Sequence, residues 1–156
     1  MISNRHDLCE DELGSGICEI LREGAVQFEK LAKLITNVSE VDLKIKIVKL
    51  AREAIIWKGE DGFELAPQKA RELTNAIMDS PRLIERDIVE FLLVHPGATA
   101  GMIAHELNKL PLEIAHRLRM MERMGATYHM DSRPRFRYFL RSKFVFLLGA
   151  TGWGGK

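Results

Sequence analysis

Basic side chains gather in one stretch of the chain, between Lys109 and Lys143. This stretch holds 9 basic and 3 acidic residues, whereas the whole chain of 156 residues has a formal net charge of only +1. Guanidinium and ammonium groups bind phosphate oxygens, and an arginine can also bond the O6 and N7 atoms of a guanine together. The chemistry that these residues predict is therefore the binding of a polyanion, above all nucleic acid.

The charge is divided between the two halves of the chain. Residues 1–80 hold 11 basic and 15 acidic residues, a net charge of −4, and residues 81–156 hold 12 basic and 7 acidic residues, a net charge of +5. A basic module joined to an acidic one can be attracted to phosphates while the other half stays clear of them. The alternative is that the arginines merely solvate a surface.

No enzyme motif accompanies the basic stretch. Gly14 and Gly16 lack the preceding strand and the following lysine of a phosphate-binding loop, and no histidine follows His105 and Glu106 at the spacing of an HExxH metal site. No histidine stands with a serine or cysteine in the context of a catalytic triad. We therefore predict no catalytic residue, no metal site, no cofactor and no enzymatic activity.

The composition predicts a cytoplasmic location. The chain contains no run of about eighteen apolar residues, and the polar, acidic residues 1–16 exclude a secretory signal and are expected to form a flexible arm. Cys9 and Cys18 have eight residues between them, a spacing that fits no common zinc motif. We expect both to be reduced thiols.

The basic stretch must be positioned by the elements around it, and two short helices joined by a tight turn are predicted there. Thr99 can cap a helix over residues 100–107, because its hydroxyl can accept a bond from a free backbone amide of the first turn. Asn108 tolerates the left-handed conformation that ends a helix. Pro111 has a preset φ that suits the first turn of the next helix.

The second of these helices is expected to run from Pro111 until Gly125 ends it. Its apolar stripe consists of Ile114, Leu118 and Met121. A turn-forming set over residues 131–134 then separates two segments rich in aromatic and β-branched residues, 127–130 and 135–140, which predicts a β-hairpin. An amphipathic helix starting at Pro81 and ending near His95 precedes the pair.

Helix, helix, turn, helix and hairpin is the element order of a winged helix-turn-helix. The run IAHRLRMMERMGATYH resembles the recognition helix and its exit in DNA-binding regulators of the ArsR and MarR type, with Leu118, Glu122 and Gly125 at the family's positions. The resemblance covers residues 81–140. It implies that the second helix of the pair lies in the major groove and that the hairpin touches the flanking backbone. Leu110 stands where the family often has a capping serine or threonine.

The resemblance also implies roles for individual residues. Contacts to DNA bases are expected from the outer face of the second helix, namely Glu113, His116, Arg117 and Met120. Arg117 is the strongest candidate among them, because a guanidinium can discriminate guanine. Contacts to the DNA backbone are expected from Thr99, His105, Lys109, Arg123, Arg133, Arg135, Arg137 and Arg141.

Residues 17–80 are predicted to form a helical region that serves dimerisation or sensing. Apolar residues recur there at alternating steps of four and three, a heptad pattern that needs a partner helix: Ile17, Leu21, Gly24, Phe28, Leu31 and Ile35. The partner is either the next helix of the same chain or a second copy. Gly24 indicates either a close backbone approach or a break between two helices.

A second helix is expected over residues 41–57, apolar on two sides and therefore buried on both. A charged connection over residues 58–67 and a short helix over residues 67–79 follow. The winged module is expected to occupy residues 81–143. Residues 144–156 are expected to form an apolar segment that packs on the body, extends the hairpin or meets a second subunit, followed by a flexible tail.

The expected fold is mainly α with a small β-hairpin, an N-terminal helical bundle or dimerisation region followed by a winged helix-turn-helix domain. The expected function is that of a homodimeric, sequence-specific regulator that binds double-stranded DNA. The alternative is a protein-interaction adaptor that does not bind DNA, which would follow if Arg119 and Arg123 pair with Glu113 and Glu122. A small-molecule effector bound among the N-terminal helices is compatible with the first function. The sequence does not specify the operator, the direction of regulation or the pathway.

Overall fold

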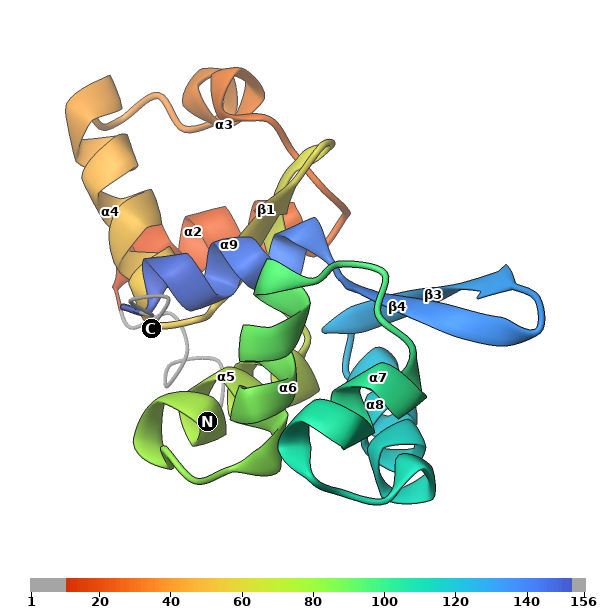
Figure 1. Cartoon of the computed structure of the whole chain (residues 1–156). Coiled ribbons are helices and arrows are strands. Elements are labelled where there is room, and N and C mark those ends of the chain that lie inside the picture. Colours follow the sequence, from red (N-terminus) through yellow and green to blue (C-terminus); the bar gives the residue numbers. More distant parts are fainter. Residues whose placement is uncertain (1–10, 153–156) are drawn as a thin grey trace. The chain divides into compact units, whose positions relative to one another are not determined.

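The computed structural model describes residues 11–152. Within this range the chain is mainly helical, with eight helices and two small antiparallel β-hairpins (Figure 1). It divides into two compact units: unit 1 comprises residues 11–66 and 146–152, and unit 2 comprises residues 67–145. No helix in the range has both the length and the apolar character needed to cross a bilayer.

Unit 1 contains α2 (Glu12–Leu21), α3 (Phe28–Leu34), α4 (Glu40–Arg52), β1 (Ile56–Gly59), β2 (Gly62–Leu65) and the end of α9 (Ser142–Ala150). The side chains buried most completely in its core are Ile17, Leu31, Leu43, Leu50 and Ile56. Phe146 of α9 packs against this core, and its ring meets the ring of Phe63 edge to face with centroids 6.5 Å apart.

Asp11 begins α2 and ties it to α4. One carboxylate oxygen lies 2.8 Å from Nζ of Lys46, and the other accepts a 2.6 Å hydrogen bond from the backbone amide of Gly14. The hydrogen bond from Lys46, followed by that from Gly14, lowers the pKa of Asp11. Residues 12–16 are helical, so the expectation of a flexible arm is wrong for them, and residues 1–10 lie outside the described range.

The stripe that begins at Ile17 is shared by two helices rather than one. Helix α2 ends at Leu21, Gly24 adopts a φ of +133°, and α3 begins at Phe28. Glycine reaches this region of φ without the steric penalty that a side chain brings. Of the two interpretations of Gly24, the break between helices is therefore confirmed.

The residues expected at a dimer seam pack inside unit 1. Ile17, Leu21 and Leu31 are 0%, 2% and 0% exposed. Phe28 and Ile35 are partly buried against the same core. This stripe is satisfied within one chain, and a dimer, if formed, must use another surface.

Cys18 is disulfide-bonded and 3% exposed, so the expectation of a reduced thiol is wrong for it. Cys9 lies outside the described residues. Disulfides are rare in the reducing cytosol. Cys18 therefore does not add support to the cytoplasmic location that the composition predicts.

Helix α4 is shorter than predicted, and an unpredicted hairpin follows it. The helix ends at Arg52, and Ala54 adopts a left-handed φ of 63° that breaks the helical path. Strands β1 and β2 then pair from Ile56 with Leu65 to Gly59 with Gly62, leaving a two-residue turn. The expected end at Trp57 and the expected connection over residues 58–67 are therefore wrong.

Unit 2 contains α5 (Gln68–Asp79), α6 (Ile84–Val94), α7 (Ala100–Leu107), α8 (Pro111–Arg123), β3 (Thr127–Ser132) and β4 (Arg135–Leu140). Helix α5 is joined to α6 by a 3.0 Å hydrogen bond from Arg86 Nη1 to the carbonyl oxygen of Ile77. The division between the units consequently falls after Ala66, whereas the sequence places the start of the second module at Pro81.

The predicted ends of α7 and α8 are confirmed. The Thr99 hydroxyl accepts a 3.1 Å hydrogen bond from the amide of Met102, Asn108 is left-handed at φ 57° and ψ 49°, and Pro111 is the first residue of α8. The predicted hairpin is also present, with β3 and β4 paired from Thr127↔Leu140 to Ser132↔Arg135. Figure 1 shows it extending beyond α7 and α8.

The apolar segment near the C-terminus is helical. Phe144, Leu147 and Leu148 lie in α9 and are at most 1% exposed. Of the three arrangements expected for this segment, packing on the body of the protein is therefore the one observed. It adds no strand to the hairpin.

Replacing Gly62 with alanine is expected to destabilise unit 1. Gly62 has a φ of +113°, and a Cβ atom added there would overlap the backbone carbonyl of Val26. We expect a loss of about 1 to 3 kcal/mol in the free energy of unfolding, because the strained backbone and the clash act together.

Gly16→Ala is the matched control. Gly16 lies inside α2, and a Cβ atom added there meets no described heavy atom within 4 Å. A gain of roughly 0.5 to 1 kcal/mol is expected from the higher helix propensity of alanine. Denaturant unfolding followed by circular dichroism compares the two variants, and equal stabilities would contradict the close approach at Gly62.

Candidate nucleic-acid interface

Helix α8 has one side in the core of unit 2 and the other in solvent. Ile114, Leu118 and Met121 are all 0% exposed, and their spacing of four and three places them on one face. Helix α7 packs against α8. The opposite side is exposed and carries Leu112, Glu113, His116, Arg119 and Arg123.

The structure agrees with part of the expected base-contacting set. Glu113 and His116 are exposed on the outer side of α8. Met120 is half-buried, and its Sδ lies 4.0 Å from Nη1 of Arg123. Arg119, to which no base contact was assigned, shares the outer side, since it lies three residues beyond His116 and four before Arg123.

Arg117 does not lie freely on this outer side, because it is held by a carboxylate of α6. Its Nη1 atom lies 2.9 Å from Oε2 of Glu85, and the two side chains are 41% and 13% exposed. The other oxygen of Glu85 is buried and has no hydrogen-bond partner among the described residues. Arg117 therefore supplies the countercharge of a nearly buried carboxylate, and this position does not favour the base contact expected of it.

The base of the hairpin is fixed to the connection between α6 and α7. Backbone amides and carbonyls of residues 97–98 and Tyr138 exchange two hydrogen bonds of 2.9 Å, from Gly97 N to Tyr138 O and from Tyr138 N to Ala98 O. Arg137 Nη1 donates a further 2.9 Å bond to the carbonyl oxygen of Gly97. Arg137 thus serves the internal structure, although its side chain was expected on the DNA backbone.

A second link joins the hairpin to α8. Nδ1 of His129 on β3 lies 2.9 Å and 3.1 Å from the two carboxylate oxygens of Glu122 on α8. The His129 ring also contacts the rings of Phe136 and Tyr138 on β4, with centroids 4.5 Å and 5.9 Å away. Burial, followed by the negative charge of Glu122, raises the pKa of Tyr138. Helix and hairpin are therefore held in one arrangement.

The residues expected on the DNA backbone fall into two groups. Thr99 is 5% exposed, and its hydroxyl oxygen accepts the capping hydrogen bond of α7, which leaves its O–H group as the donor that a phosphate contact would need. Five of these residues are exposed and form no ion pair among residues 11–152, namely His105, Lys109, Arg123, Arg133 and Arg135. Arg141 is also exposed and lies over the Tyr128 ring, 5.5 Å from its centroid.

A small pocket lies where α7, α8 and the hairpin meet. Its volume is about 240 Å³, and it is lined by Thr99, Ala100, Gly101, Ala115, Arg135, Phe136 and Tyr138. The first turn of a helix has backbone amides without an intrahelical partner, and its dipole favours negative charge. Arg135 is the one basic residue of the lining, so an anion placed in this pocket would lie beside a basic residue and the start of α7.

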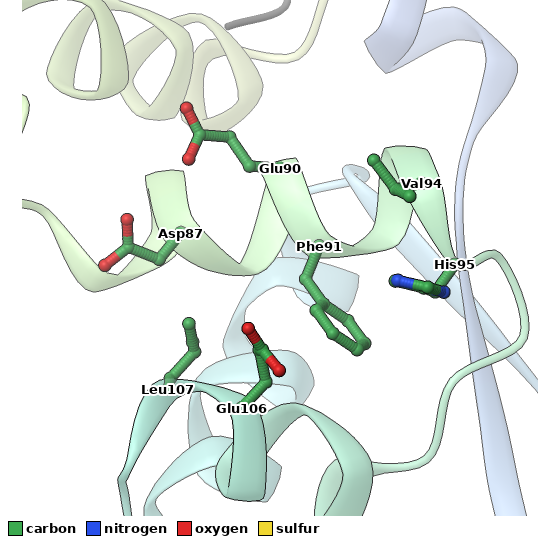
Figure 2. A pocket seen from close by; sticks show the side chains of 7 residues that line it. All are labelled: Asp87, Glu90, Phe91, Val94, His95, Glu106 and Leu107. Atoms are coloured by element: carbon green, nitrogen blue, oxygen red, sulfur yellow. The ribbon is translucent and has the colours of Figure 1, made fainter.

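A pocket of opposite charge lies between α6 and α7 (Figure 2). It has a volume of about 300 Å³, and its lining includes the carboxylates of Asp87, Glu90 and Glu106. The ring of Phe91 lies in it beside His95, with ring centroids 4.6 Å apart. Phosphates would be repelled there, so this pocket does not belong to a nucleic-acid interface. No local sequence pattern reveals this pocket, because its residues come from two helices.

Arg117→Ala is expected to destabilise unit 2. The change leaves the nearly buried carboxylate of Glu85 without its countercharge, at a cost of about 1 to 3 kcal/mol. Adding Glu85→Ala removes that carboxylate, so the double variant is expected to lose less stability than the sum of the single variants.

Arg119→Ala is the control for this cycle. Arg119 is exposed and has no ion pair among the described residues, so its removal is expected to change stability by no more than about 0.5 kcal/mol. Urea unfolding of all four variants measures the coupling. Strictly additive losses for Arg117→Ala and Glu85→Ala would show that the pair does not stabilise the unit.

No family model matches this chain, and neither a curated protein nor a solved structure matches it. Its function is therefore inferred from the residues of unit 2 themselves.

Proposed function

We propose that this protein is a sequence-specific regulator that binds double-stranded DNA through a winged helix-turn-helix. Helix α8 would lie in the major groove, and the β3–β4 hairpin would lie on the flanking backbone. The observation that carries the proposal is the outer side of α8, where His116, Arg119 and Arg123 are exposed and have no ion pair within residues 11–152.

The dimensions and chemistry of α8 support this function. The helix runs over 13 residues from Pro111 to Arg123. This corresponds to a length of about 20 Å, and a helix fits the width of the major groove of B-form DNA. A guanidinium on its outer side can bond guanine O6 and N7 together, and Arg119 is the exposed arginine near the centre of that side. Glu113, His116 and Met120 would read neighbouring base edges.

The hairpin and the start of α7 supply groups for phosphates. Arg133 and Arg135 are exposed near the turn of the hairpin, and Arg135 also lines the small pocket at the start of α7. Lys109, His105 and Arg141 are further exposed candidates. Contacts of this kind set orientation and salt dependence, whereas the base edges set sequence preference.

A protein-interaction adaptor is the alternative, and one observation favours it. Leu110 and Leu112 at the start of α8 are 71% and 84% exposed, and large exposed apolar side chains can mark a protein contact. The adaptor would be favoured if Arg119 and Arg123 formed ion pairs with Glu113 and Glu122 and so neutralised the positive face of α8. No such ion pair is present within residues 11–152. Glu122 instead contacts His129, and Arg123 lies beside Met120. The charge distribution therefore favours DNA over the adaptor.

The proposal includes binding as a homodimer in the cytoplasm, where a disulfide such as that of Cys18 would be unusual. Two copies would place two recognition helices one helical turn of DNA apart, about 34 Å, and would select an inverted repeat.

Arg119→Ala is expected to relax sequence preference. Loss of one bidentate arginine contact removes about 1 to 3 kcal/mol of discrimination at one base pair. The measurement is selection from random duplexes, followed by fluorescence anisotropy on the selected site and on single-base variants. An unchanged preference at every base pair would remove Arg119 from the proposal.

Arg133→Ala is expected to weaken binding to all duplexes alike. Removing one phosphate contact should reduce the slope of log affinity against log salt by about 1. Lys69→Ala is the matched control, because Lys69 is an exposed basic residue of α5 outside the proposed interface. Equal effects of the two substitutions, or no duplex binding by the unmodified protein at low salt, would contradict the proposed function.

A further inference from the structure

Helix α4 is apolar on two sides, and only one of them is covered. Leu43, Ile47 and Leu50 are at most 5% exposed in the core of unit 1. Val41, Ile45 and Val48 on the other side are 66%, 62% and 53% exposed. The sequence predicts that both sides are buried, whereas the second side is exposed to solvent although its residues are apolar. We name Val41, Ile45 and Val48 the outer stripe of α4.

The outer stripe has the spacing and shape of a helix-packing surface. Its members follow one another at steps of four and three, the pattern by which one helix fits a partner helix. A shallow groove of about 580 Å³ runs beside it, with Ile45 and Val48 as its apolar residues and Lys44, Lys49, Arg52 and Glu53 as its charged ones. Such a groove can receive side chains from a second helix.

Charge changes sign along α4. Glu40 and Asp42 lie in its first turn, and Lys49 and Arg52 lie in its last. Asp42 and Lys49 are seven residues apart, so they lie on the same edge of the outer stripe at opposite ends. Both are exposed, and neither forms an ion pair within residues 11–152.

We propose that the outer stripe binds the outer stripe of a second copy of this chain, with the two α4 helices antiparallel. Ile45 of one copy then packs on Val48 of the other, and Asp42 of each copy lies beside Lys49 of the other. A twofold axis repeats every contact, so this charge pair forms twice. A parallel arrangement would instead bring Lys44 of one copy against Lys49 of the other, which is repulsive.

This inference deepens the proposed function by naming the surface that makes the dimer. The stripe from Ile17 to Ile35 is occupied inside unit 1, whereas the outer stripe of α4 is not. Self-association through α4 can be measured without DNA. The proposed dimer can therefore be tested independently of DNA binding.

The test is the mass of the full chain in solution, measured by sedimentation equilibrium over a series of protein concentrations. The unmodified protein is expected to be dimeric. Asp42→Lys and Lys49→Asp place like charges together, so each single variant is expected to raise the dimer dissociation constant at least about tenfold. The double variant Asp42→Lys with Lys49→Asp restores opposite charges and is expected to recover the dimer.

The double variant is also a control for folding. It carries both substitutions, so it could not recover the dimer if either substitution disrupted the fold. Ile45→Lys is expected to give a monomer with an unchanged circular dichroism spectrum. Val94→Lys is the matched control, because Val94 is 72% exposed on α6 in unit 2, and this change should leave the mass dimeric.

Three results would overturn the proposal: a monomeric mass for the unmodified protein at all concentrations, a double variant as weak as the single ones, or a dimer unaffected by Ile45→Lys. The second result would assign the stripe to a different partner or to a parallel arrangement. A monomer that binds duplex DNA would refute this inference and the homodimeric part of the proposed function, but not DNA binding itself. A dimer without duplex affinity would refute DNA binding alone.

Discussion

The burial of three side chains of α8 determines what this helix can present to another molecule. Ile114, Leu118 and Met121 are fully enclosed, so α8 cannot rotate about its axis without exposing apolar surface, at a cost of about 1.5 to 3 kcal/mol for each side chain. With the rotation set, His116 and Arg119 face outward and Arg117 lies at the flank, where it meets Glu85. The identity of the exposed arginine thus follows from the packing beneath it.

Unit 2 has a basic surface and an acidic pocket in different places. The exposed basic side chains lie on the outer side of α8 and on the hairpin, whereas Asp87, Glu90 and Glu106 line the pocket between α6 and α7. A polyanion would be attracted to the first and repelled by the second. This division would give a duplex bound as proposed one preferred orientation, independently of any contact with base edges.

Local signals predicted much of unit 2. Thr99, Asn108 and Pro111 each act within about one helical turn, so their residue types alone located the ends of α7 and α8. The contact between Arg117 and Glu85 spans 32 positions of the chain, and no periodicity reveals such a pair. The same limit explains why the capping role of Thr99 could be predicted from its residue type, whereas its burial to 5% exposure could not.

The end of α4 and the hairpin that follows it were harder to predict, because they depend on a backbone conformation that the residue types do not indicate. Ala54 adopts a left-handed conformation that alanine rarely takes, and this ended α4 earlier than its apolar pattern indicated. Strands β1 and β2 have four residues each, too few for an alternating pattern to stand out. The outer stripe of α4 was recognised as apolar from the sequence, but its exposure became evident only once the core beneath the opposite side was known.

The hairpin of unit 2 is fastened at one end only. Its base is held by the bonds between Tyr138 and residues 97–98, by Arg137 and by the contact of His129 with Glu122, whereas residues 131–136 beyond them are exposed. A change in the length of the turn would therefore alter how far the hairpin extends from unit 2 without changing the packing of α8, so the extent of the hairpin and the orientation of α8 can vary independently.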